Sequence, residues 1–128
     1  MFVDWEKYID DGILAIPEQY RDKIKNVAIL LEDDPSDEVR VSEGLGDNET
    51  LLGLYQGVPL PDRGEGYGVG APMPDTITIY KNPTLEEAED TDGDVARVIR
   101  ETIWHEFGHY FGLDEDEVRR RENGRGLV

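Results

Sequence analysis

The stretch RETIWHEFGHYFGL, residues 100–113, holds both histidines of the chain. His105 and His109 are four positions apart, and Glu106 follows the first of them. Residues 94–111 fit one long helix, on which these three side chains fall on the same side as the apolar residues of the preceding turns. The sequence therefore predicts a helix that turns two imidazoles and a carboxylate toward the interior of the domain.

The two ends and the outer side of this helix can also be predicted. Arg97, Glu101 and Gly108 fall on the side opposite the histidines, which is expected to face solvent. Acidic residues precede the helix, where its dipole favours them, and Thr91 or Asp92 is the predicted cap. The helix is expected to stop at Gly112, in the left-handed conformation that glycine adopts readily.

The spacing of the histidines indicates a metal site. β-Carbons at positions i and i+4 of a helix lie about 6 Å apart, so both imidazoles can reach one zinc ion at about 2.0–2.1 Å. Glu106 lies on the same side and can take a proton from a water molecule that the metal acidifies. This is the H-E-x-x-H arrangement of zinc peptidases. The alternative is a helix with two partly buried histidines and no metal, but the chain has no histidine outside this motif.

Four consecutive acids follow the predicted helix stop: Asp114, Glu115, Asp116 and Glu117. The returning chain could meet the metal there, so the third ligand is expected among them. The stretch LDEDEVRRREN looks like a new helix, in which Asp114 would be the N-cap and Glu117 would complete a capping box. Asp116 would then point to solvent. From the residues alone, Asp114 and Glu115 both remain candidates.

Composition excludes several classes of function. The chain has 128 residues, the size of one domain. Its 30 acidic and 13 basic residues give a net charge of −17, which argues against binding to nucleic acid or an anionic membrane, because both would be repelled. The charge favours a cationic partner, such as a metal ion or a basic peptide. The absence of cysteine excludes disulfides, thiolate zinc sites and cysteine catalysis.

The N-terminal stretch MFVDWEKYIDDG has neither the basic region nor the apolar run of a signal peptide. No apolar stretch approaches the ~20 residues that span a membrane. A cytoplasmic protein is therefore expected.

Apolar patterning predicts the remaining elements. Apolar residues recur at three- and four-residue steps from Phe2 to Ile16, which predicts an amphipathic helix ending near Pro17, and a short second helix follows. Runs rich in branched residues predict three strands, at 26–33, 50–57 and 76–82. The first strand is expected to be buried. This order, without regular βαβ alternation, predicts an α+β fold with helices packed on a small sheet.

Two segments have the glycines or acids of ligand-binding loops but are explained more simply. The alternating glycines of residues 64–70 lack the Gly-Lys-Ser/Thr ending of a phosphate loop, so an ordinary mobile loop is predicted. The acids of residues 90–101 fall at calcium-loop positions, but the glycine is misplaced for such a loop. An acidic start to the following helix accounts for them.

Several segments together resemble a small bacterial family of single-domain zincin-like metallopeptidases, with the motif H-E-x-x-H-x-x-G-x-x-D/E. The matching segments, in order, are NVAILLEDDP, LLGLYQGVPL, PDTITIYKNP and RETIWHEFGHYFGL. The resemblance covers most of residues 1–120. It implies a minimal zincin-like fold over 1–128, an α+β domain with a small mixed sheet, a backing helix and an active-site helix. It also implies a zinc peptidase in which His105 and His109 bind Zn²⁺ and Glu106 is the catalytic base.

The resemblance also chooses between the candidate third ligands. The family position that meets the metal, an Asp in many relatives, is matched by Glu115. The predicted zinc ligands are therefore His105, His109 and Glu115, with Asp114 as the alternative.

The sequence departs from larger relatives in ways that bear on the substrate. Few residues follow Gly112, and the only methionines are Met1 and Met73, so no methionine turn beneath the metal is expected. A half-built cleft suggests short or unfolded peptide substrates, or a homo-oligomer or protein partner that completes it. Tyr67 and Tyr110 are candidate transition-state stabilisers, with ordinary packing as the alternative for each.

The predicted function is hydrolysis of peptide bonds, on substrates that are neutral to basic. An extended peptide is expected to add to a strand edge, and the strand TITIYKN is the predicted edge. The alternative function is a non-catalytic zinc-binding or protein-interaction module on the same fold.

Overall fold

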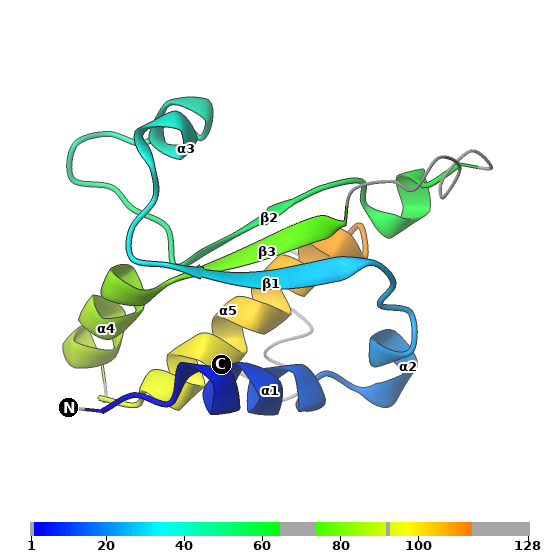
Figure 1. Cartoon of the computed structure of the whole chain (residues 1–128), viewed down its shortest axis with the longest axis horizontal. Helices are drawn as coiled ribbons and strands as arrows, with labels where there is room; N and C mark the ends of the chain where they lie inside the picture. Colours follow the sequence, from blue (N-terminus) through cyan, green and yellow to red (C-terminus); the bar gives the residue numbers. More distant parts are fainter. Residues whose placement is uncertain (1, 65–73, 92, 114–128) are drawn as a thin grey trace.

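The computed structural model describes residues 2–64, 74–91 and 93–113. A three-stranded mixed sheet lies at its centre, in the order β1-β3-β2. β1 (Val27–Glu32) runs parallel to β3 (Asp75–Tyr80), and β2 (Gly53–Gln56) runs antiparallel to it. This small mixed sheet with several helices confirms the predicted α+β class (Figure 1).

Helices α1 (Trp5–Leu14) and α5 (Val95–Tyr110) lie on the same side of the sheet (Figure 1). α5 contacts both β2 and β3, and α1 packs against α5 as the predicted backing helix. α3 (Asp37–Ser42) stands away from the sheet on the opposite side. The remaining helical elements are α2 (Glu18–Arg21), α4 (Lys81–Asp90) and the 3₁₀ turn η1 (Leu60–Asp62).

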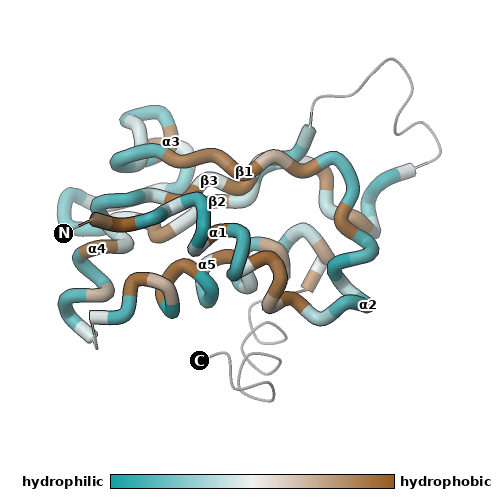
Figure 2. The backbone as a smooth tube through the Cα atoms, turned by 60° about the horizontal axis from the view of Figure 1, so that its bottom comes forward, coloured by the Kyte–Doolittle hydropathy of each residue, from teal (hydrophilic) through white to brown (hydrophobic). Residues whose placement is uncertain are grey.

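The core forms between the sheet and α5. Ile77 and Ile79 on β3 are fully buried, and so are Ile99 and Ile103 on α5. Burial of each such side chain stabilises the fold by roughly 1.5–3 kcal/mol. Apolar stretches run along both β1 and α5 (Figure 2). Val98 and Ile99, on the predicted inward side of the long helix, are buried, so that side is the one that packs.

The strand predictions need three corrections. β1 is an edge strand whose Leu30 and Leu31 are 42% and 38% exposed, so the expectation of a buried strand is wrong. β3 is the central strand, paired on both sides, and it cannot be the predicted free edge. Residues 81–82 begin α4 rather than ending the strand. α4 was not predicted, because its sequence is polar on nearly every side and has no apolar stripe.

Both ends of α5 are held by specific contacts. Asp94, rather than Thr91 or Asp92, is the cap, and its side chain accepts a hydrogen bond from the Arg97 N–H at 3.0 Å. At the other end Gly112 has φ of +82°, as predicted.

The helix stop is a Schellman motif. The N–H groups of Gly112 and Leu113 donate to the carbonyl oxygens of His109 and Gly108, at 3.0 and 2.9 Å. A β-carbon at position 112 would lie 2.6 Å from Cγ of Pro61, so close approach as well as backbone conformation requires glycine there. Gly108 is buried, contrary to its expected place on the solvent side.

Within the described residues, no helix is both long and apolar enough to cross a lipid bilayer.

Candidate metal centre

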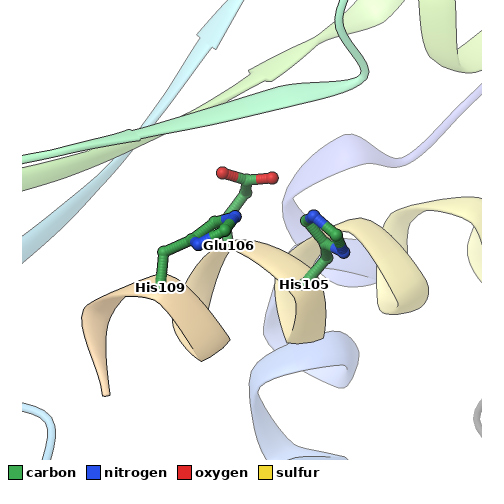
Figure 3. A group of neighbouring side chains, drawn as sticks. All are labelled: His105, Glu106 and His109. Atoms are coloured by element: carbon green, nitrogen blue, oxygen red, sulfur yellow. The ribbon is translucent and has the colours of Figure 1, made fainter. Parts of the chain in front are cut away.

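One turn of α5 brings the predicted metal-binding side chains together. Ligand atoms of His105, Glu106 and His109 all lie within 4.8 Å of one another. The two imidazole rings are 5.1 Å apart between centroids and nearly perpendicular. Both rings project from the same side of α5, and the Glu106 carboxylate points toward the strands (Figure 3). Two imidazole nitrogens and a nearby carboxylate form a donor set that suits zinc.

The edge strand β2 fixes the Glu106 carboxylate. The Tyr55 backbone N–H donates to Oε1 of Glu106 at 2.9 Å, and the glutamate is only 8% exposed. A charge-assisted hydrogen bond of this kind orients a buried carboxylate. Two segments that are 51 residues apart in the chain are thereby joined at the proposed base.

Gly53 allows β2 to lie this close to α5. A β-carbon at position 53 would be 2.7 Å from Cγ2 of Thr102, 3.0 Å from the Thr78 carbonyl oxygen and 3.4 Å from Cγ of Glu106. Sequence reasoning missed both Gly53 and Tyr55. A signal was present for the glycine, because an isolated glycine within a strand pattern often marks a close backbone approach.

A buried polar cluster supports the strand that holds Glu106. The Tyr55 hydroxyl donates to Oδ2 of Asp75 at 2.6 Å, and Nη2 of Arg63 donates to the same oxygen at 2.7 Å. The side chains of Arg63 and Asp75 are 6% and 3% exposed. Burial, followed by the hydrogen bond to Asp75, raises the pKa of the Tyr55 phenol, so the hydroxyl stays protonated and donates.

The contact between Arg63 and Asp75 also joins the chain before the glycine-rich segment to the strand that follows it, while residues 65–73 lie outside the described part of the chain. Arg63 is the last residue before residues 64–70, and Asp75 begins β3. Nη1 of Arg63 donates to the Lys25 carbonyl oxygen at 3.0 Å, which adds the chain before β1 to the same cluster. The sequence carried no sign of this pairing, because the two residues lie in no common motif.

Tyr110 is a packing residue. It is fully buried, and its hydroxyl accepts a hydrogen bond from the Lys25 N–H at 2.9 Å and donates to the Lys23 carbonyl oxygen at 3.1 Å. The Arg63 guanidinium lies 4.9 Å from the centre of its ring. These contacts use both functions of the hydroxyl in holding the end of α5 to the chain before β1. Of the two alternatives given for Tyr110, ordinary packing is therefore the one that the structure supports.

The other predicted site residues lie outside the described part of the chain. These are Asp114 and Glu115, the two candidates for the third ligand, and Tyr67, the second candidate stabiliser. Their assignments stay predictions.

A cavity of about 340 Å³ lies beside the metal-binding turn. His105 and Glu106 form part of its wall, and the rest comes from earlier turns of α5, from the chain that enters β2 and from α4. A space of this size suits one or two substrate groups next to a metal.

Comparison with known protein families agrees with this geometry. The model of a family described as zincin-like metallopeptidases matches residues 24–125, which is most of the chain. The chain belongs to this family. No curated protein matches it. The matched segment of this zincin-like protein contains the sheet, α4 and α5, whereas the backing helix α1 precedes it. Family membership and the His105, Glu106 and His109 cluster together suggest a metallopeptidase with a candidate metal site.

Proposed function

We propose that this protein is a zinc-dependent peptidase that hydrolyses short or unfolded peptides. The observation that carries the proposal is the convergence of two imidazoles and a buried carboxylate on one helical turn, beside an open cavity. A structural histidine pair would need neither the adjacent carboxylate nor the cavity. Membership of the zincin-like metallopeptidase family supports the same reaction.

In this proposal each side chain has one task. His105 and His109 would hold a zinc ion, and the chemistry that zinc would supply there is Lewis acidity toward a carbonyl oxygen and a bound water. Glu106 would accept a proton from the attacking water and pass it to the leaving amine. The Tyr55 N–H keeps the carboxylate of Glu106 in a fixed orientation at Oε1.

The substrate is proposed to lie along β2. The strand edge predicted from the sequence, TITIYKN, cannot take the peptide, because β3 is hydrogen-bonded to strands on both sides. β2 is the edge strand next to α5, and its Tyr55 N–H reaches Glu106. An extended peptide added there would place its backbone beside the metal-binding turn.

The charge of the substrate, the cellular location and a partner for the cleft are also proposed. The net charge of −17 favours neutral to basic peptides. We place the protein in the cytoplasm, and a second copy or another protein could complete a cleft that this chain builds only in part.

Metal analysis combined with digestion of a peptide library tests the proposed function. We expect one zinc ion per chain, cleavage that a chelator abolishes, and recovery of cleavage when zinc is returned. His105→Ala should lose both zinc and activity, because only two of the three predicted protein ligands would remain. A zinc-loaded protein that cleaves no peptide in the library would overturn the proposal.

The third ligand can be identified by zinc affinity. Glu115→Ala should weaken zinc binding far more than Asp114→Ala, which should mainly lower stability by about 1 kcal/mol through loss of a helix cap. Both variants would be titrated with zinc against a competing chelator. If Asp114→Ala released the metal and Glu115→Ala did not, the ligand would be Asp114.

A further inference from the structure

The cavity beside the metal-binding turn has an apolar wall. Leu51 and Leu52, from the chain that enters β2, line it together with Val98 and Thr102 of α5, which are 2% and 5% exposed. The Thr102 hydroxyl donates to the Val98 carbonyl oxygen at 2.8 Å, so that hydroxyl is satisfied within the helix. The inner part of the cavity therefore suits an aliphatic chain rather than a polar group.

Two acids on the more exposed side of the wall also line the cavity. They are Glu101 of α5, which is half-buried, and Glu87 of α4, which is exposed. Glu101 is already paired, since Nη1 of Arg97 lies 2.8 Å from both of its carboxylate oxygens. Among the described residues, no hydrogen bond or ion pair holds the exposed carboxylate of Glu87. Glu87 is therefore the acid at this cavity that can receive a cation from outside.

Three features of the cavity together indicate which kind of side chain would fill it. His105 and Glu106 line the cavity, so a side chain that fills it would lie next to the metal-binding turn. Its volume of about 340 Å³ admits a long side chain. Its wall is apolar near Leu52 and Val98, and its rim carries a negative charge at Glu87. Lysine and arginine combine an aliphatic stem with a cationic end, and they commonly bury the first while the second stays near water.

We propose that this cavity is a specificity pocket for a lysine or arginine side chain next to the scissile bond, and that Glu87 selects its positive charge. The proposal rests on the proposed peptidase function and adds the residue that determines substrate choice. The aliphatic stem packs on Leu51, Leu52 and Val98, and the cation lies at Glu87. The other acids of α4 do not line the cavity, so selection depends on this one position rather than on the charge of the helix.

Matched peptides test the pocket. Three peptides would differ at one position beside the cleaved bond, with lysine, norleucine or glutamate. Norleucine has a similar aliphatic stem but no charge. An ion pair at an exposed carboxylate is worth at most about a fivefold change in a rate or equilibrium constant. We therefore expect kcat/KM to be up to about fivefold higher for lysine than for norleucine at low salt, and lowest for glutamate.

Variants of two neighbouring acids separate a local from a general charge effect. Glu87→Gln should bring the lysine-to-norleucine ratio close to one, and Glu87→Lys should make the glutamate peptide better than the lysine peptide. Glu86→Gln makes the same change one residue away, on an exposed residue that does not line the cavity. It should leave the ratio unchanged. An unchanged ratio in Glu87→Gln, or an equal loss in Glu86→Gln, would overturn the proposal.

A binding measurement distinguishes failure of the pocket from failure of the peptidase function. The same peptides would be titrated into ¹⁵N-labelled protein, with the amide signals of Leu52, Gly53 and Val98 as the readout. Cleavage without preference for lysine would overturn the pocket and leave the peptidase function standing. If the lysine peptide binds in a way that depends on Glu87 but is not cleaved, the pocket stands and the peptidase function is overturned. If the protein neither cleaves nor binds the peptides, both the pocket and the peptidase function are overturned.

Discussion

Glu106→Gln is expected to lower peptide hydrolysis on the order of 10²-fold or more while zinc binding is retained. Glutamine has nearly the same size, and its amide oxygen can still accept the hydrogen bond from the Tyr55 N–H that Oε1 of Glu106 accepts at 2.9 Å. It cannot accept the proton of the attacking water. The measurement is kcat/KM on a peptide from the library digest, together with zinc content and an unfolding curve.

Glu86→Gln is a suitable control for this variant as well, because the substitution is the same and the residue is exposed and away from the metal-binding turn. It should hydrolyse the peptide at the wild-type rate. Glu106→Gln that keeps zinc, unfolds like the wild type and still cleaves at the wild-type rate would show that Glu106 is not the base. Loss of zinc in this variant would instead make Glu106 a metal ligand.

Asp75→Ala is expected to destabilise the protein by about 3–5 kcal/mol, because it removes the carboxylate of a buried ion pair while the positive charge of Arg63 stays in place. The Tyr55 hydroxyl loses its acceptor at the same time. This is a large share of the roughly 5–15 kcal/mol that stabilises a typical domain. Urea unfolding would measure the change as a lower midpoint. Adding Arg63→Met should recover part of the loss, since it removes the buried positive charge that Asp75 balances in the wild type.

An exposed ion pair gives the matched control. Lys7 and Asp11 form a salt bridge of 2.8 Å on the surface of α1, with side chains that are 63% and 57% exposed. Asp11→Ala should leave the unfolding midpoint nearly unchanged, because solvent already screens that pair. Equal midpoints for Asp75→Ala and Asp11→Ala would mean that the buried cluster at Arg63 and Asp75 does not stabilise the fold.

The local features of α5 could be predicted because they depend on residues within one or two turns. The i and i+4 spacing places His105 and His109 on one side of any helix, whatever surrounds it. The stop at Gly112 also depends on a local property, the ease with which glycine takes a positive φ. The α+β class was predictable for the same reason, since apolar periodicity and short branched runs report on neighbouring residues.

Only the tertiary structure decided which strand is central and what holds Glu106. Strand order depends on pairing between segments that are far apart, so the sequence did not show that β3 separates β1 from β2. That order leaves β2 as the edge beside α5 and allows the hydrogen bond from Tyr55 to Glu106 across 51 positions. It also buries Arg63 with Asp75. The sequence alone therefore determined the chemical groups on one helical turn, and the packing of distant segments determined which strand faces them, because nonlocal contacts leave no periodic pattern in the chain.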